Sequence, residues 1–334
     1  MPPAVAVSRA PAVAFTQLTL LNGWRTYPGA SHAAVANISG IVTFKGSIQT
    51  DGSNSEPFTL PKAFRPATNV YVAVALCSAT KGRLFIRPTG LVTVSAEGGT
   101  FSNAACVTSL DGVSFARSAT SFTKLKLKNG WLNAPFGTSA AAVRVIAGTA
   151  HFKGAIFTHG TKADAFTLPT GFRPAATVSI PVDLCDDTKG QLKITPNGVA
   201  AVQAENSFSD AACFTSLDGL TFATSAKSFT ALSLKNGWQP NGPASYKPAA
   251  RAVSGLVQFE GAIRNVGGNL NLAMFTLPKG LRPAKLVYIE VNLCNAHNGR
   301  LYIQPDGQVF VYVAGGKLKY ARCLTSLDGA WFAR

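Results

Sequence analysis

Acidic residues and long apolar runs are both scarce in this chain of 334 residues. It has 15 Asp plus Glu against 31 Lys plus Arg, and charged residues make up 14%, about half of the ~25% in an ordinary soluble protein. Because 47% of the residues are hydrophobic, the chain has enough apolar surface to fold and is not intrinsically disordered. No segment approaches the roughly 18 consecutive apolar residues of a membrane-spanning helix, so we expect no membrane span.

Met and acidic residues, which line the faces of many long helices, are also few. Met occurs twice and acids are too rare to line many helix faces, whereas Gly occurs 31 times, Pro 19 times and Phe 21 times. Gly and Pro favour turns and Phe favours strands, so we predict an all-β chain of short strands. The first residues, 1–14, are rich in Ala, Val and Pro and are predicted to form an extended N-terminal arm.

One unit occurs three times after this arm. A Trp that follows Asn-Gly recurs as Trp24, Trp131 and Trp238, a spacing of 107 residues (131 − 24 and 238 − 131). This period is far longer than the ~20–50 residues of a solenoid repeat, so each copy should be a domain with its own core. The predicted units, named here the first, second and third copies, are residues 15–120, 121–227 and 228–334.

Each copy contains a segment in which apolar residues alternate with variable ones. In the first copy the apolar residues are Val70, Val72 and Val74, and the variable neighbours in the other copies include Asp183 and Asn292. We predict a strand with its apolar face in the core and its variable face outside. About seven or eight such strands per copy predict three tandem, homologous antiparallel β-sandwich (jelly-roll-like) domains.

The connections between copies are very short, so neighbouring copies must touch. Ser114 to Thr120 leads almost directly into Phe122 at the first junction. A compact pseudo-trimer, with the three sandwiches around an approximate threefold axis, is favoured over an open string of domains.

The six Cys fall into one pair per copy, and the partners are 28 or 29 positions apart. These pairs are Cys77 and Cys106, Cys185 and Cys213, and Cys294 and Cys323. The spacing is too long for a zinc knuckle, so we predict one structural disulfide within each copy. The alternative is six reduced Cys used as small hydrophobic residues. Disulfides would indicate a protein that works outside the cell.

Catalytic and metal-ligating residues do not repeat. The four His, at positions 32, 151, 159 and 297, occupy no common place in the three copies, and no nucleophile elbow, phosphate-binding loop or zinc-protease motif is present. We therefore predict no enzyme activity, no metal site and no cofactor.

The residues that do repeat favour structural roles first. An Arg before Pro and an Asp before Gly could form an ion pair between loops, or the Asp could close a turn with its Gly. These residues are Arg65, Arg173 and Arg282, and Asp111, Asp218 and Asp328. The repeated Trp24, Trp131 and Trp238 could cap the core or stack on a sugar ring.

The order of these motifs resembles a module of phage tail fibres and receptor-binding proteins. The motifs are Leu-x-Leu-x-Asn-Gly-Trp ending at Trp24, Phe-x-Gly-x-Ile from Phe44, Phe-Thr-Leu-Pro from Phe58, Ile-x-Pro-x-Gly from Ile86 and Ser-Leu-Asp-Gly from Ser109. The resemblance covers nearly all of residues 15–334. It implies a β-sandwich head that assembles as a trimer and binds a cell-surface glycan or wall polymer.

Function is expected where the copies differ, in their loops and charge. Lys plus Arg number 12 against 4 acids in residues 229–334, so the third copy is the basic end. The candidate binding residues are Trp24, Trp131, Trp238, Lys81, Lys189, Lys317, Lys319 and Arg322.

The leading hypothesis is a non-enzymatic virion protein of a tail fibre, baseplate or capsid decoration. It would contact other virion proteins and attach to an anionic or glycan surface, in the virion or the extracellular space. The alternative is a secreted lectin or adhesin. Specific nucleic-acid binding is disfavoured because Lys and Arg are dispersed, with no dense basic run. A polysaccharide-degrading enzyme is the last class considered.

Overall fold

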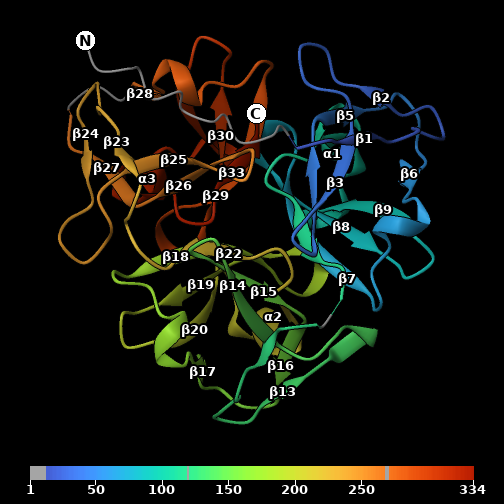
Figure 1. Cartoon of the computed structure of the whole chain (residues 1–334), viewed down its shortest axis with the longest axis horizontal. Helices are drawn as coiled ribbons and strands as arrows, with labels where there is room; N and C mark the ends of the chain where they lie inside the picture. Colours follow the sequence, from blue (N-terminus) through green and yellow to red (C-terminus); the bar gives the residue numbers. More distant parts are fainter. Residues whose placement is uncertain (1–12, 119, 268–270) are drawn as a thin grey trace, which may run out of the picture.

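The computed structural model describes residues 13–118, 120–267 and 271–334. Of the predicted N-terminal arm, only Val13 and Ala14 are among the described residues. Figure 1 shows three β-rich lobes that follow one another in sequence and surround a common centre. The predicted all-β class with antiparallel sheets is confirmed. The unit boundaries at residues 14, 120 and 227 stay a prediction.

The strands and helices have the same order in each copy. The first copy has β1 (Thr16–Gln17), β2 (Arg25–Thr26), β3 (Ala34–Ile38), β4 (Ile41–Lys45), β5 (Ser47–Gln49), β6 (Phe58–Thr59), β7 (Val70–Ala75), β8 (Lys81–Ile86), β9 (Leu91–Ala96), α1 (Phe101–Cys106), β10 (Thr108–Ser109) and β11 (Ser114–Ala116). The second has β12 (Thr123–Lys124), β13 (Trp131–Asn133), β14 (Ala142–Ile146), β15 (Thr149–Lys153), β16 (Ala155–Thr158), β17 (Asp164–Thr167), β18 (Val178–Asp183), β19 (Lys189–Ile194), β20 (Val199–Ala204), α2 (Phe208–Cys213), β21 (Thr215–Ser216) and β22 (Thr221–Ala223). The third has β23 (Thr230–Ala231), β24 (Trp238–Pro240), β25 (Ala249–Val253), β26 (Leu256–Glu260), β27 (Ala262–Asn265), β28 (Ala273–Thr276), β29 (Val287–Asn292), β30 (Asn298–Ile303), β31 (Gln308–Val313), α3 (Lys319–Cys323), β32 (Thr325–Ser326) and β33 (Trp331–Ala333).

Short 3-10 helices connect the strands. They are η1 (Lys62–Phe64), η2 (Cys77–Ala79), η3 (Glu97–Gly99), η4 (Pro135–Gly137), η5 (Thr170–Phe172), η6 (Cys185–Asp187), η7 (Lys279–Leu281), η8 (Cys294–Ala296) and η9 (Ala314–Gly316).

Each copy consists of three small antiparallel sheets over one apolar core. In the first copy the sheets have the strand orders β1-β3-β4-β11, β10-β5-β2 and β6-β9-β8-β7, and the later copies repeat this arrangement. A Phe row forms the centre of each core: Phe58, Phe44 and Phe115 in the first copy have ring centroids 6.0–6.3 Å apart. All three side chains are fully buried, because strand alternation turns Phe44 and Phe115 of one sheet and Phe58 of another toward the core between the sheets.

The three predicted disulfides are confirmed. Cys77 pairs with Cys106, Cys185 with Cys213, and Cys294 with Cys323. Each bond joins the 3-10 helix that follows β7, β18 or β29 to the end of the short α-helix. Closing a loop of about thirty residues stabilises a small domain by roughly 3–4 kcal/mol, and such bonds persist in oxidising compartments outside the cytosol.

Backbone hydrogen bonds join the copies in a closed ring. The amide of Asn69 donates to Gly137 O at 3.1 Å, joining the first copy to the second. Thr177 N donates to Ala244 O at 2.8 Å, and Leu286 N donates to Gly29 O at 3.0 Å. The same loop of each copy therefore docks on the same segment of a neighbour, and the third copy closes the ring on the first.

Strands β7, β18 and β29 meet pairwise at the centre of this ring. Their variable face was predicted to be outside, and this prediction is wrong at the end nearest the disulfides. Asp183 and Asn292 are each 1% exposed, because the outward face of each strand packs against the other copies. The centre of the molecule is thus a second, partly polar core.

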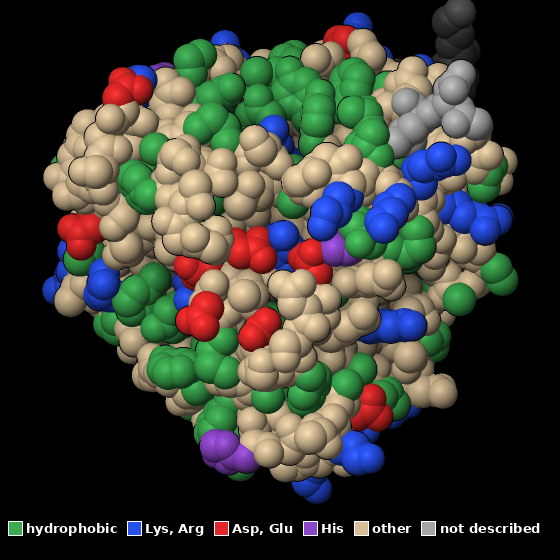
Figure 2. Space-filling view, turned by 180° about the vertical axis from the view of Figure 1, so that it is seen from behind, with side chains coloured by type: hydrophobic (Ala, Val, Ile, Leu, Met, Phe, Trp, Pro, Cys, Tyr) green, Lys and Arg blue, Asp and Glu red, His purple; other side chains and the backbone are tan. Residues whose placement is uncertain are grey.

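Charged side chains hold this centre together. Lys81 of the first copy forms an ion pair with Asp183 of the second, and Lys189 Nζ lies 3.0 Å from Glu97 and 3.2 Å from Glu205. Figure 2 shows acidic, basic and His side chains gathered across the middle of the molecule, where the copies meet.

Five buried carboxyl groups predict a pH-dependent stability. Burial raises the pKa of Asp111, Asp218 and Asp328 to about 7, that of Glu260 to about 7 and that of Glu290 to about 8. Unfolded Asp and Glu have a pKa of about 4, so these five groups bind more protons in the folded state than in the unfolded state up to about pH 8. Lys81, whose pKa burial lowers to about 7, opposes them in part above that pKa. The free energy of unfolding should therefore fall as the pH rises from about 6.5 to 8, by roughly 1 kcal/mol per group.

Urea unfolding across this range measures the effect. His151, whose pKa burial lowers to about 4, opposes the trend only at lower pH, where the unfolded imidazole takes up a proton. Asp218→Asn keeps an oxygen that can accept from Gly154 N but cannot titrate, so its slope should be smaller than that of the natural chain. A stability that rises with pH over this range would contradict the prediction.

Candidate functional site: the tyrosine face

The three repeated Trp side chains are buried core caps. Their exposed fractions are 5%, 4% and 3% for Trp24, Trp131 and Trp238. Each indole N–H donates to a backbone carbonyl at 2.8 Å, on Asn54, Lys162 and Asn271 respectively. The rings are therefore not available to stack on a sugar ring, and the core-capping alternative describes them.

Two of the candidate Lys residues are also not free surface groups. Lys81 is fully buried and paired with Asp183, and the side chain of Lys189 is 16% exposed between Glu97 and Glu205. Both side chains connect neighbouring copies, because each pairs with a carboxylate of another copy. Their charges are therefore already neutralised within the chain. A ligand would have to displace those carboxylates.

The repeated Arg and Asp side chains bind the backbone. Asp111 Oδ1 accepts from Gly46 N at 3.0 Å, and Arg65 Nε donates to Leu60 O at 2.9 Å. The pairs of the later copies do the same: Asp218 with Gly154, Asp328 with Gly261, Arg173 with Leu168 and Arg282 with Leu277. Among the described residues these Arg and Asp side chains form no ion pair with each other.

The remaining basic candidates lie on the third copy. Lys317 and Lys319 are exposed at the start of α3, and Arg322 is half-buried and donates to Gly267 O at 2.7 Å. On the face seen in Figure 2, Lys and Arg side chains gather at the right, where the third copy lies. Within the described part of the chain, Lys317 and Lys319 form no salt bridge, and Lys319 Nζ lies 5.1 Å from the Tyr320 ring centroid.

A set of aromatic side chains lies on the outer face of the sheet with the strand order β28-β31-β30-β29. Tyr288, Tyr302 and Phe310 are neighbours across β29, β30 and β31, and Arg300 and Tyr312 form the next row. The rings of Tyr288 and Tyr302 stack with centroids 5.2 Å apart, and those of Tyr302 and Phe310 lie 5.9 Å apart. We call these five residues the tyrosine face.

The first copy completes one edge of the tyrosine face. The Tyr27 ring packs edge-on against Tyr288 at 5.9 Å, and Arg300 donates to Leu76 O of the first copy at 2.8 Å. The Arg300 guanidinium lies 4.6 Å from the Tyr288 ring centroid and 5.9 Å from that of Tyr312. Ring closure between the copies thus fixes the aromatic rows in place.

Burial and exposure divide the tyrosine face into a base and a surface. Tyr288 is 7% exposed, whereas Tyr312 is 37% exposed and Tyr302 and Phe310 are half-buried. Burial raises the pKa of Tyr288 and lowers that of Arg300. The rings of Tyr302, Phe310 and Tyr312 therefore form the exposed apolar surface, with two phenol hydroxyls. The buried Tyr288 ring and the Arg300 guanidinium pack against them.

Equivalent positions carry different residues in the other copies. Tyr288, Tyr302 and Phe310 correspond by strand register to Ser179, Lys193 and Ala201 of the second copy. The first copy has Tyr71, Phe85 and Thr93. This face is not among the predicted binding residues, because functional variation was expected in the loops and not on the outward positions of the strands. Comparing the outward positions of the three strands would have found it.

Among the described residues, no group of His, Cys, Asp and Glu is placed to hold a metal ion, and no helix is long and apolar enough to cross a membrane. Comparisons of the chain with protein-family models, curated proteins and solved structures found no match.

Proposed function

We propose that the chain is a non-enzymatic binding protein that attaches to a glycan or anionic polymer on a cell surface. The observation that supports this most is the tyrosine face. The first copy has only the stacked pair Tyr71 and Phe85 at the equivalent positions, and the second copy has no aromatic residue there. A row of aromatic rings offers apolar planes for the C–H face of a sugar, and the Tyr hydroxyls offer hydrogen bonds at the rim.

The nearby charge supports an anionic partner. Lys317 and Lys319 come soon after β31, the strand that carries Phe310 and Tyr312, and η9 (Ala314–Gly316) separates them from it. Exposed Lys residues attract a polyanion at long range, and the aromatic rings add contacts at short range. Three disulfides agree with work outside the cytosol.

We propose that the protein is a component of a virion, as the resemblance to tail-fibre heads implies. A secreted lectin or adhesin would use the same surface and is the alternative. Mass spectrometry of purified particles separates the two, because only a virion component copurifies with the particle at fixed stoichiometry.

Glycan arrays and wall-polymer binding test the site. Tyr302→Ala and Tyr312→Ala should each weaken binding about tenfold or more, as truncation of a central aromatic anchor does. Phe136→Ala is the matched control, because Phe136 is 60% exposed but lies on η4 of the second copy. Its binding should equal that of the natural chain.

Charge reversal separates the aromatic and ionic contributions. Lys317→Glu with Lys319→Glu should weaken binding more at low salt than at high salt. Lys124→Glu with Lys126→Glu, which changes two exposed residues of the second copy, should have little effect. Binding of nucleic acid without any glycan or polymer, or equal losses in both Lys pairs, would overturn the proposal.

A further inference from the structure

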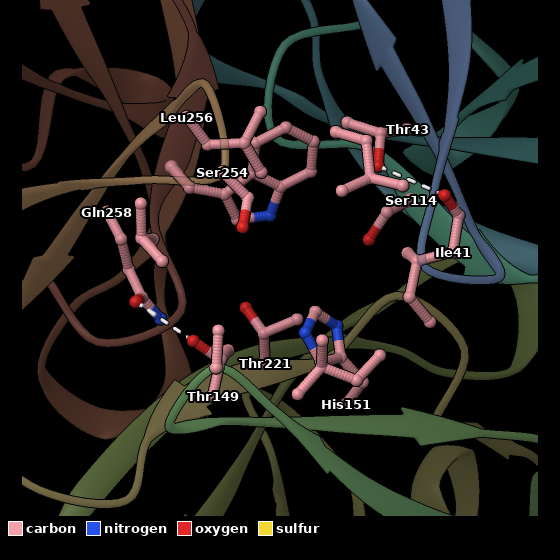
Figure 3. A pocket seen from close by; sticks show the side chains of 14 residues that line it. Ile41, Thr43, Ser114, Thr149, His151, Thr221, Ser254, Leu256 and Gln258 are labelled. Carbon is pink, nitrogen blue, oxygen red and sulfur yellow. Dashed lines mark hydrogen bonds between the residues drawn. The ribbon is translucent and has the colours of Figure 1, made fainter. Parts of the chain in front are cut away.

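A pocket lies where the three copies meet, between their equivalent hairpins. The hairpins are β3–β4, β14–β15 and β25–β26, and each turns through two residues with positive φ, such as Ser39 and Gly40. Two consecutive residues with positive φ are typical of a type I′ hairpin turn, and Gly is favoured as the second of them. Figure 3 shows side chains from all three copies around one open space.

Equivalent positions of the pocket carry different side chains. Strand pairing places Thr43 opposite Ser114 in the first copy, His151 opposite Thr221 in the second, and Gln258 opposite Trp331 in the third. All six line the pocket, together with Ile41, Thr149 and Leu256 from the next positions of the hairpins. The pocket is therefore asymmetric, although the backbone around it repeats three times.

Two buried polar atoms in the pocket have no hydrogen-bond partner among the residues that the structure describes. Thr221 is 3% exposed, and its hydroxyl oxygen is unpartnered, as is Nδ1 of His151. In Figure 3 the hydroxyl groups of Ser114, Thr221 and Ser254 face the open space. An unpartnered buried polar group costs roughly 1–3 kcal/mol, so a ligand that pairs with these atoms would recover that free energy.

The lining offers no charge to a ligand. Burial, with the nearby charge of Arg144, lowers the pKa of His151 to about 4, so its imidazole is neutral near pH 7. Arg251 approaches the wall, but its guanidinium already donates to Gln258 at 2.8 Å and Thr149 at 3.0 Å. An ionic ligand would lose its hydration without gaining a free counter-charge. The chemistry therefore favours a neutral group.

The size of the pocket limits the group to a few heavy atoms. Its volume is about 50 Å³, which exceeds the roughly 10–15 Å³ that one water molecule requires. The occupant must combine an apolar part, for Ile41, Leu256 and Trp331, with a donor or acceptor for Thr221 and His151.

We propose that this pocket binds an acetamido group carried by a larger molecule. Its methyl group fits the apolar wall of Ile41 and Leu256, its carbonyl oxygen can accept from the Thr221 hydroxyl, and its N–H can donate to His151 Nδ1. Hydroxyls and a neutral imidazole supply both roles. An N-acetylated amino sugar and an acetylated amine or peptide end both carry this group. The site does not use the tyrosine face.

Methyl-detected saturation-transfer NMR on the full chain tests this with matched small probes. Acetamide should bind saturably in the millimolar range, and acetate, nearly the same size but charged, should bind at least about tenfold more weakly. N-acetylglucosamine against glucose, and N-acetylated against free glycine amide, then identify the larger molecule. No saturable binding of acetamide, or equal binding of acetate, would overturn the proposal.

Thr221→Val removes the hydroxyl and keeps the side-chain shape. It should weaken acetamide binding about tenfold while leaving stability unchanged or higher, because it removes an unpartnered polar atom. His151→Leu is the second variant and should also lose binding. Tyr312→Ala should lose glycan binding at the tyrosine face but keep acetamide binding, so failure of one site is distinguishable from failure of the other. Unchanged acetamide binding in both pocket variants would overturn the assignment.

Discussion

Asp183→Ala is expected to lower the free energy of unfolding by about 3–5 kcal/mol. The carboxylate is fully buried between Lys81 and Arg83 of the first copy, and the Arg83 Nε lies 2.5 Å from its Oδ2. Removing it leaves the Lys81 ammonium, which is also fully buried, without its main counter-charge. Burial already lowers the pKa of Lys81. In the Asp183→Ala variant the Lys81 amine will therefore lose its proton more readily, and this relieves part of the cost of a buried unpaired charge.

Denaturant unfolding of a set of variants separates charge from packing. Lys81→Met combined with Asp183→Leu removes both charges and keeps apolar volume, so it should be closer to the natural chain than Asp183→Ala is. Arg25→Ala, which breaks the exposed pair with Asp51, is the control and should change stability by less than about 1 kcal/mol. A loss below about 1 kcal/mol for Asp183→Ala would show that the pair does not hold the copies together.

Gly154→Ala is the second substitution with a large expected effect, a loss of about 2–5 kcal/mol of unfolding free energy. Gly154 has φ +88°, and an added Cβ would lie 2.4 Å from Ser139 O and 2.6 Å from Ala140 O. Its amide also donates to Asp218 at 2.8 Å. The new methyl group meets backbone that cannot move without breaking this contact, so the strain adds to the cost of the left-handed conformation.

Gly98→Ala is the matched control for this steric effect. Gly98 has φ +69° with nothing within 4 Å of an added Cβ, so only the backbone conformation contributes, about 1–2 kcal/mol. Thermal and denaturant unfolding of the two variants should differ clearly, with Gly154→Ala the less stable. Equal losses would mean that the crowding at Gly154 relaxes without cost.

The position of Gly154 also explains a repeated motif. The same Gly recurs as Gly46 and Gly261, each with positive φ and each donating to the buried Asp of its copy. In the sequence these Asp residues could be read as one half of an ion pair or as turn formers. The structure shows a third use, in which the carboxylate accepts the amide of a strand-connecting Gly from 64 to 67 residues earlier.

Local pattern was sufficient for the secondary structure and the disulfides. Apolar residues at every second position, as at Val70, Val72 and Val74, indicate a strand, because side chains of a strand have a period of two. The structure shows that these three residues are buried. The Cys pairs could be found because each recurs at nearly the same spacing within one unit. Local pattern could not show which outward faces are covered, since the period is the same whether water or another copy lies beyond them.

The sequence by itself determined an all-β chain of repeated units with one disulfide each, because periodicity, turn residues and Cys spacing are local properties. Tertiary structure alone decided that Lys81 and Asp183 are buried, that Trp24 is closed off, and that Tyr312 and Thr221 belong to binding surfaces. The burial of Lys81 and Asp183 and the pocket at Thr221 depend on how three copies close into a ring, whereas Trp24 is closed off within its own copy. The contacts involved join residues from 30 to about one hundred positions apart, and no local pattern records them.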